Sequence, residues 1–386
     1  MHRRDFLRSS SKAALVFSLF PLAGCVQGVR PSTELKNSAL VEASIAYLEK
    51  VIPKLMEENH VPGVSIALIK GGKLFWRRVF GVKDSQSQEP VDHDTVFEAA
   101  SVSKTVFAYA VLKLCERGVI GLDTPLTKYA PKPFLEGDAR LELITARRVL
   151  SHTTGFQDWR SGAAPLKIHF QPGAKYFYSG EGYNYLQSVV TQLTGHVNPN
   201  DCARYEADLK VCATDIDVYL KANLLVPFGM VSSGYVWNDT FEKHTARPHD
   251  AEGRPLKKAK PKATDAARYA AAGGLHTTPT DYAKFLIEVI NPKESDTFRL
   301  SAASLKEMVR PQAKVDDSHS WALGWEIYHG PKGDQILHGG NQRGFHAFAV
   351  ASVERRSGLV IMTNGDNGWK LNAEVVKQVM ERYLVG

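Results

Sequence analysis

Strand-like segments stand near both ends of this 386-residue chain, and helix-like segments stand between them. Val64–Ile69 and Leu74–Phe80 are apolar, β-favouring runs on either side of Gly71-Gly72, a pattern that predicts an antiparallel hairpin. The last third alternates short apolar runs with Gly and Asn turns and ends in a helical pattern over 373–384. Such a chain buries its apolar faces most simply in one mostly antiparallel sheet built from both ends and flanked by helices. We therefore predict an α+β fold, a three-layer α/β/α sandwich, with a mainly helical region inserted at about 100–270.

The motif with the most chemical content is Ser101-Val102-Ser103-Lys104, which opens an apolar segment with helical spacing. A serine and a lysine three residues apart share one face of a helix. A neutral lysine can take the proton of a hydroxyl that attacks a carbonyl carbon, and burial or nearby cations are needed to keep the lysine neutral. We predict that Ser101 is the nucleophile and Lys104 the base. The same spacing arises by chance in a chain of this length, as at Ser9 and Lys12.

The first 24 residues have the features of an export signal. Arg3-Arg4 precedes an apolar stretch, 13–23, that is too short to span a bilayer. The stretch ends in Leu22-Ala23-Gly24-Cys25, which resembles the lipobox of bacterial lipoproteins, in which the cysteine is lipidated. We expect a Tat-type lipoprotein signal peptide over 1–24, a tether over 25–39 that begins with a lipidated Cys25, and a hydrolase domain over 40–386. The protein is then expected to be exported, to face the periplasm and to be anchored to a bacterial membrane by its lipid. A plain cleaved signal or an uncleaved anchor is the alternative.

Composition limits the other classes of function. With 44% hydrophobic and 23% charged residues the chain is typical of a globular protein. Without residues 1–24, which hold four basic side chains and one acidic one, the formal charge falls from +7 to +4. Much of that excess lies in the basic tract 254–262, which we interpret as a solvated loop, with contact to an anionic lipid or polymer as the alternative. The sequence lacks a nucleic-acid-binding module and a metal-ligand spacing, so we expect no nucleic acid, metal or cofactor.

The three cysteines after Cys25 support different interpretations. Cys115 occupies an apolar position after the Ser101–Lys104 motif and is expected to be a buried small hydrophobic residue. Cys202 and Cys212 flank a short polar segment that looks like an insertion. In an oxidising compartment these two residues could form a local disulfide, with two free thiols as the alternative.

Six sequence blocks together resemble the class C β-lactamase and penicillin-binding-protein-like serine hydrolases, which include family VIII esterases and D-aminopeptidases. The blocks are Val61–Ser65, Phe97–Thr105, Leu150–Gly155, the block around Tyr178, Ala272–Leu275 and His338–Gly340. The resemblance extends from about Leu40 to the end of the chain. It implies a serine β-lactamase/transpeptidase-like fold and an acyl-enzyme mechanism at Ser101.

The resemblance also assigns roles to individual residues. Ser101 matches the family nucleophile, Lys104 the lysine of the first motif, and Tyr178 the tyrosine of the second motif, which moves a proton between nucleophile and leaving group. His338-Gly339-Gly340 matches the third motif on a strand beside the substrate, and the N–H group of Asn341 is implied to join that of Ser101 in an oxyanion hole. We expect a cationic Lys104 to favour the phenolate of Tyr178, so that the pair acts as one base.

Two departures from the family pattern bear on the substrate. Gly180 stands where the second motif usually has an asparagine, and Glu181 or Asn184 is the candidate replacement. His338 stands where β-lactamases have a lysine; because histidine is mostly neutral near pH 7, the cation for a substrate carboxylate is weakened, unless Arg343 supplies it.

We therefore expect a serine hydrolase that acts on an ester, amide or peptide, with a small molecule or a cell-wall-derived peptide as substrate. A true β-lactamase and a catalytically silent cell-wall peptide-binding protein are the alternatives. An α/β-hydrolase would need a Gly-x-Ser-x-Gly turn, which the sequence lacks.

Overall fold

The computed structural model of the chain describes residues 32–130, 133–160, 164–194, 216–257 and 269–382. The predicted signal peptide, the predicted lipidation site Cys25 and the two cysteines Cys202 and Cys212 lie outside these ranges. Helix α1 (Ser32–Asn59) begins inside the predicted tether, so residues 32–39 are helical. Within the described ranges, none of the helices combines the length and apolar character that a membrane span requires, and no group of three or more His, Cys, Asp or Glu side chains is arranged to hold a metal ion.

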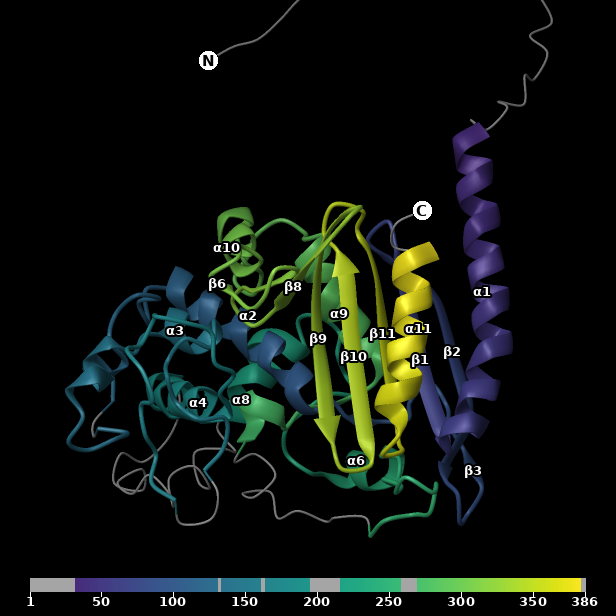
Figure 1. Ribbon diagram of the computed structural model, residues 1–386, viewed down its shortest axis with the longest axis horizontal. Coiled ribbons are helices and arrows are strands. Elements are labelled where there is room, and N and C mark those ends of the chain that lie inside the picture. Colours follow the sequence, from purple (N-terminus) through teal and green to yellow (C-terminus); the bar gives the residue numbers. More distant parts are fainter. Residues whose placement is uncertain (1–31, 131–132, 161–163, 195–215, 258–268, 383–386) are drawn as a thin grey trace, which may run out of the picture.

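A nine-stranded antiparallel sheet forms the middle of the molecule (Figure 1), with the order β3-β2-β1-β11-β10-β9-β8-β7-β6. Its strands are β1 Gly63–Lys70, β2 Lys73–Asp84, β3 Glu89–Pro90, β6 Ala313–Lys314, β7 His319–Trp321, β8 Glu326–Gly330, β9 Gly333–Gln342, β10 Phe345–Ser352 and β11 Ser357–Thr363. Strand β1 near the N-terminus pairs with β11 near the C-terminus, from Val64 opposite Thr363 to Ile69 opposite Gly358. The prediction that both ends of the chain build one sheet is confirmed.

The N-terminal hairpin forms where the sequence predicts it. Gly71 and Gly72 have φ angles of 56° and 71°, which match the tight turn that follows the twist of a two-stranded ribbon. Alternate residues of β1 face opposite sides of the sheet: Val64, Ile66 and Leu68 belong to one apolar core, and Ala67 and Ile69 belong to the other. A central strand with helices over both faces is buried along nearly its whole length, as β1 is.

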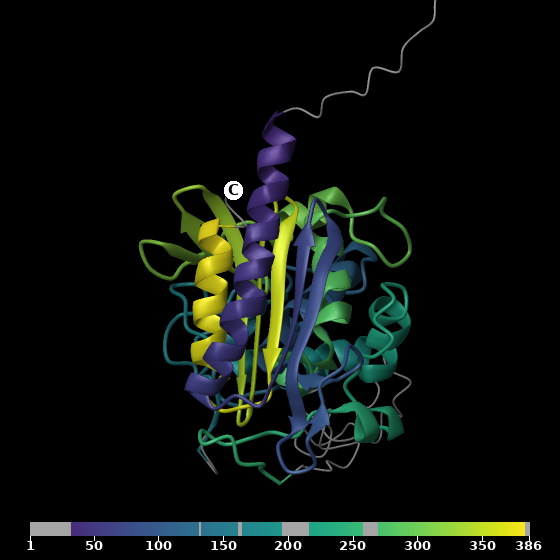
Figure 2. The ribbon, with the colours of Figure 1, turned by 90° about the vertical axis from the view of Figure 1, so that its right-hand side faces the viewer.

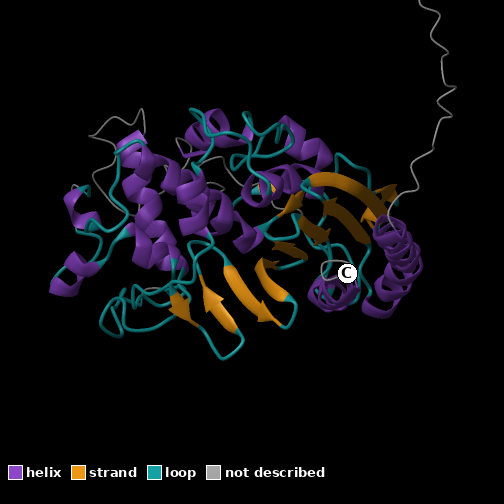
Figure 3. Ribbon diagram, turned by 90° about the horizontal axis from the view of Figure 1, so that it is seen from above, coloured by secondary structure: helices purple, strands orange, loops and turns teal. Residues whose placement is uncertain are grey.

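Helices cover both faces of the sheet and complete three layers. α1 and α11 (Gly368–Arg382) lie side by side on one face (Figure 2), where Ile52 and Val375 pack against strand residues such as Ile66. α2 (Ser103–Glu116), α9 (Pro279–Ile290) and the helical region lie on the other face (Figure 3). The predicted α/β/α architecture is confirmed.

The region between β3 and β6 is mainly helical in its described part. Its elements are β4 Phe97–Glu98, η1 Ala100–Val102, α2, η2 Leu126–Lys128, η3 Ala139–Leu143, α3 Ala146–Leu150, α4 Gly180–Thr194, η4 Lys221–Leu225, α6 Asp239–His244, α8 Ala270–Gly273, β5 His276–Thr277, α9 and α10 Ala302–Met308. Strands β4 and β5 pair with each other in a small second sheet. Cys115, near the end of α2, is partly buried against the main core. The first turn of this region, η1, packs against β9, which brings the inserted helices to the large sheet.

Candidate active site

Ser101 and Lys104 lie where the chain enters α2. Ser101 is in the 3₁₀ turn η1, and Lys104 is in the first turn of α2, so the two side chains project from the same face. The Lys104 Nζ atom donates a hydrogen bond to Ser101 Oγ over 3.1 Å. Ala100 precedes the serine with a φ of 47°, a conformation that non-glycine residues seldom adopt. Ser103 supports this turn, because its Oγ donates to the Ala100 carbonyl oxygen at 2.6 Å and accepts the Leu275 N–H at 3.0 Å.

Lys104 has the environment of a neutral amine. Its side chain is completely buried, and its Nζ also donates to the Ala272 carbonyl oxygen at 2.5 Å. Burial lowers the pKa of Lys104 to about 7, an effect that the carboxylate of Asp158 opposes. Near neutral pH a large share of the molecules therefore carries an uncharged lysine next to the serine hydroxyl, which a general base requires.

Tyr178 lies close to both Ser101 and Lys104. A hydrogen bond joins its hydroxyl group to the side chain of Ser101, and its ring centroid is 5.0 Å from Lys104 Nζ. Burial raises the pKa of Tyr178, while the hydrogen bond with Ser101 opposes the rise. The expectation that Lys104 favours the phenolate is therefore wrong, because burial removes the hydration that a phenolate needs. Tyr178 is positioned as a neutral proton donor and acceptor.

Two aromatic side chains that the sequence analysis did not single out enclose Tyr178. The ring of His152 stacks on it with centroids 4.1 Å apart, and Trp321 of β7 meets it edge-on at 5.7 Å. The Nδ1 atom of His152 accepts the Ser179 N–H at 3.0 Å, so the proton of a neutral His152 is on Nε2. Burial, reinforced by the charge of Lys104, lowers the pKa of His152 well below its usual value. The block Leu150–Gly155 was a signal for His152, whereas nothing in the sequence pointed to Trp321.

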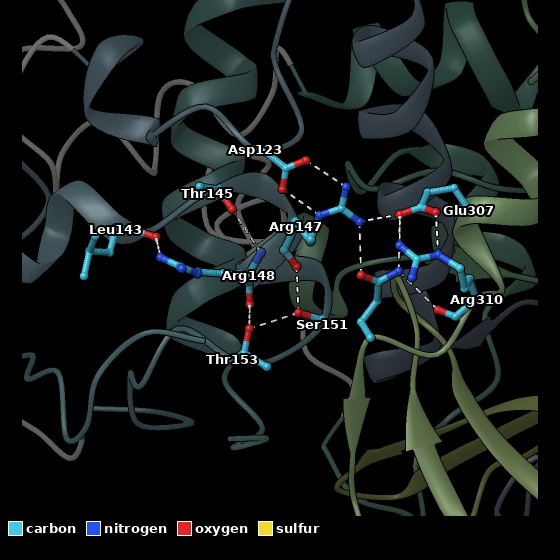
Figure 4. Close-up of polar contacts among 10 residues, drawn as sticks. Asp123, Leu143, Thr145, Arg147, Arg148, Ser151, Thr153, Glu307 and Arg310 are labelled. Carbon is cyan, nitrogen blue, oxygen red and sulfur yellow. Dashed lines mark hydrogen bonds and ion pairs between the residues drawn. The ribbon is translucent and has the colours of Figure 1, made fainter. Parts of the chain in front are cut away.

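A charged network fixes the helix and loop that carry His152 (Figure 4). The Arg147 guanidinium donates to both carboxylate oxygens of Asp123, at 2.6 and 2.8 Å, and also contacts Glu307 of α10. Ser151 Oγ closes the turn by donating to the Arg147 carbonyl oxygen at 2.8 Å. Hydrogen bonds from Arg310 and Arg147 lower the pKa of Glu307 to about 2, so the network stays ionised over the physiological range. It joins α3 to α10 and so holds the His152 loop in place.

The third motif lies on β9, against the turn that holds Ser101. A Cβ atom on Gly340 would lie 2.2 Å from the Ala99 carbonyl oxygen, so only glycine lets β9 come this close. Strand β8 pairs with β9 only as far as Leu337, and beyond that point, among the described residues, β10 is the strand that pairs with His338–Gln342. Opposite β10, this part of β9 therefore has no strand partner among the described residues.

The side chain of Asn341 is hydrogen-bonded to His346 Nδ1 at 2.7 Å, while the role of its N–H group in an oxyanion hole stays a prediction.

His338 does not replace the missing lysine as a cation. Its ring is buried, and its Nδ1 atom lies 2.8 Å from the Gly339 carbonyl oxygen. Burial, reinforced by Lys104, lowers the pKa of His338 to about 3. Arg343 is exposed in the turn after β9. The third motif therefore brings glycine backbone and a neutral imidazole to the site.

The two candidates for the missing second-motif amide, Glu181 and Asn184, are both buried in α4, and their part in the site stays a prediction. Glu181 is paired with Arg160, whose Nε and backbone N–H both donate to Glu181 Oε1 at 3.0 Å. The space beside Gly180 is filled by the ring of Trp159, since a Cβ atom on Gly180 would lie 2.4 Å from that ring. Trp159 thus explains the glycine at this position.

Comparisons with known proteins agree with this geometry. The family model described as Beta-lactamase matches residues 48–380. Among curated proteins, Protein flp of Staphylococcus aureus (strain N315) is 21% identical over 89% of this chain and 66% of its own length. Esterase EstB of Burkholderia gladioli is 27% identical over 55% of this chain and 56% of its own. The chain therefore spans less than two thirds of these relatives.

Solved structures show the same fold. A protein from Pseudomonas syringae described as a Beta-Lactamase/D-Alanine Carboxypeptidase superposes with a TM-score of 0.71 at 18% identity, over 90% of this chain and 99% of that one. The octameric penicillin-binding protein homologue from Pyrococcus abyssi superposes with a TM-score of 0.70 at 23% identity, over 88% of this chain and 78% of that one.

Proposed function

This chain belongs to the Beta-lactamase family, and from that premise we propose that it is a serine hydrolase that cleaves an ester, amide or peptide through an acyl intermediate on Ser101. The observation that carries the proposal is the contact between the buried Lys104 Nζ and Ser101 Oγ, 3.1 Å apart. A lysine whose pKa is about 7 can accept the serine proton at physiological pH. Relatives in the family that are described as esterase and as carboxypeptidase support a hydrolytic function.

The proton movements follow from the positions of three side chains. Lys104 takes the hydroxyl proton of Ser101 as Oγ bonds to the substrate carbonyl carbon, and the carbonyl oxygen becomes negatively charged. The N–H groups of Ser101 and Asn341 are the proposed donors to this oxygen, each worth several kcal/mol in such a site. As the carbonyl re-forms and the bond to the leaving group breaks, the neutral Tyr178 gives its proton to the leaving group and takes back the proton held by Lys104. Water cleaves the acyl ester by the same steps in reverse.

Among the substrates of this chemistry, we place esters and amides ahead of β-lactams. The third motif supplies no fixed cation beside the nucleophile, because His338 is buried and neutral. A substrate whose recognition depends on a carboxylate therefore lacks its usual partner. A true β-lactamase and a catalytically silent peptide-binding protein are the two alternatives to be distinguished by experiment.

The test is intact-mass spectrometry of the purified protein over time with p-nitrophenyl butyrate and, separately, with benzylpenicillin. We expect a butyryl adduct and nitrophenolate release in the wild type and neither in Ser101→Ala. With benzylpenicillin we expect a slow or absent adduct. Rapid penicillin turnover would instead identify a β-lactamase, and the absence of both an adduct and hydrolysis for every ester and amide tried would favour the silent binding protein.

We also propose that the enzyme is exported and lipid-anchored at Cys25, on the support of the Arg3-Arg4 and Leu22–Cys25 patterns. Expression of the full chain in a bacterial host with radiolabelled palmitate tests this. We expect label and membrane association that are lost in Cys25→Ser and kept in the matched variant Cys115→Ser. Label retained by Cys25→Ser would overturn the anchor, and export that survives replacement of Arg3 and Arg4 by lysine would overturn the Tat route.

A further inference from the structure

The loop that carries Asp158 and Trp159 is held against the start of α4, which follows Tyr178 in the chain. Asp158 Oδ1 accepts the Gly180 N–H at 2.9 Å, and the Asp158 carbonyl oxygen accepts the Glu181 N–H at 3.0 Å. Ser179 Oγ donates to the Gln157 carbonyl oxygen at 2.8 Å. These bonds hold the loop by both main chain and side chain, so its position relative to Tyr178, two residues before Gly180, is set by the fold.

The loop presents an aromatic surface at the place where the second motif usually has an amide. The ring of Trp159 lies against Gly180 and packs edge-on against Tyr269, with centroids 5.3 Å apart. Although each ring packs on the other, Trp159 remains 45% exposed and Tyr269 39% exposed. We call Asp158, Trp159 and Tyr269 the acidic–aromatic shelf.

The charges around the nucleophile favour a cation at this shelf. Asp158 is exposed, and its carboxylate accepts the N–H of Gly180, two residues after Tyr178, so its negative charge lies beside the Tyr178 segment. The neighbouring guanidinium of Arg160 is already paired with Glu181 at 3.0 Å. A second carboxyl, Glu326 of β8, also acts on Tyr178. The imidazoles of His152 and His338 add no compensating positive charge.

We propose that the acidic–aromatic shelf binds an ammonium group of the substrate. A carboxylate supplies the opposite charge, and the faces of Trp and Tyr rings attract cations through their quadrupoles. The chemical class selected is an ester or amide that carries a positively charged amine, and carboxylate-bearing analogues are disfavoured by the same charges. The proposal rests on the proposed function, because it concerns the substrate of the Ser101 site.

The experiment compares matched substrates that differ in charge. p-Nitrophenyl esters of hexanoic acid, 6-aminohexanoic acid and adipic acid place a neutral, ammonium or carboxylate end on equal acyl chains. Butyrylthiocholine and its uncharged S-(3,3-dimethylbutyl) analogue test the leaving-group side. In at least one of the two series, we expect the wild type to have a kcat/KM about tenfold higher for the ammonium substrate than for the neutral one. This is the size expected of one ion pair supported by aromatic rings.

The variant Asp158→Asn keeps an oxygen that can accept the Gly180 N–H but removes the charge. We expect it to bring the ammonium-to-neutral ratio of kcat/KM close to one, whereas Glu374→Gln on α11, across the sheet, loses one negative charge and keeps the wild-type ratio. If Asp158→Asn proves unstable, the wild-type ratio should still fall as salt is raised from about 0.01 to 1 M, where screening becomes strong.

A ratio near one in both series of wild-type substrates, or an unchanged ratio in Asp158→Asn, would overturn the shelf proposal while leaving the proposed function intact. Hydrolysis of no ester above the Ser101→Ala background would instead overturn the proposed function itself. The two failures are thus distinguishable in one set of assays.

Discussion

The imidazole of His152 lies almost flat on the phenol ring of Tyr178, with centroids 4.1 Å apart and an angle of 27° between the ring planes. Through Nδ1 the same imidazole accepts the N–H of Ser179, the residue after Tyr178. One side chain thus orients both the ring of Tyr178 and the backbone next to it. His152 therefore positions Tyr178.

Replacement of His152 separates these two contacts. His152→Asn keeps an acceptor for the Ser179 N–H and tolerates the native φ of 54°, but it removes the stacked ring. We expect kcat to fall by about tenfold with little change in KM, since a small displacement of a proton-transfer group is costly to the chemical step. The pH profile should keep its shape, because a buried neutral His152 does not titrate in the working range. A wild-type kcat in a folded His152→Asn would show that the stack does not position Tyr178.

The lowered pKa of Lys104 should affect both the activity and the pH dependence of the free energy of unfolding. Since its pKa is about 7 in the folded protein and 10.5 in the reference state, the unfolded chain binds the extra proton between these values. The free energy of unfolding should therefore rise with pH from about 7 to 10, by up to about 1.4 kcal/mol per unit from this group. Lys104→Met should abolish activity, remove that slope and be the more stable protein near pH 7.

The control is Lys54→Met, which removes one positive charge from a lysine that is 71% exposed. It should change neither the slope nor the activity. Urea unfolding at several pH values measures the first quantity. In the wild type, kcat/KM should increase through an apparent pKa near 7, and a profile flat from pH 6 to 8 would count against Lys104 as the base.

Tyr178 and Tyr176 form a matched pair, because both contact Trp321 while the hydroxyl of Tyr178 is bonded to Ser101. Tyr178→Phe should lower kcat about 10²- to 10⁴-fold, the usual contribution of a positioned acid–base group. Tyr176→Phe should stay within a few-fold of the wild type. Steady-state kinetics with the ester substrate decides the matter, and equal losses in the two variants would assign Tyr178 a packing role only.

Gly340 and Gly339 make a second matched pair, on β9. A methyl group at position 340 meets backbone at 2.2 Å, whereas at position 339 it meets the edge of the Phe348 ring at an ordinary 3.5 Å. Gly340→Ala should destabilise the protein by about 1–3 kcal/mol and reduce activity strongly, because β9 can no longer approach the Ser101 turn. Gly339→Ala should be mild in both respects. Thermal unfolding and kcat/KM test this, and the opposite order would contradict the packing described here.

Much of the fold could be predicted from local patterns. The hairpin at Gly71-Gly72 and the alternating strands of the last third followed from residue periodicity, and one sheet built from both ends of the chain followed from the need to bury their apolar faces. That β1 pairs with β11 within this sheet is shown by the tertiary structure. The positions of Ser101 and Lys104 on one helical face also follow from their spacing alone. These features depend on residues that are close together in the sequence, so sequence patterns alone are enough to predict them.

The environment of the site was decided by residues far apart in the chain. Trp159 occupies the space beside Gly180, Trp321 reaches Tyr178 from a strand 143 positions later by the chain numbering, and Arg160 pairs with Glu181. The protonation states also differ from expectation: Tyr178 holds its proton because burial removes the hydration that a phenolate needs.

Local sequence patterns therefore indicated the candidate catalytic groups and the elements that bear them, because helix and strand periodicities depend on near neighbours in the chain. The tertiary structure alone decided their charge states and what surrounds them, because desolvation, ring stacking and strand–turn contacts such as Gly340 against Ala99 arise only when distant segments pack together.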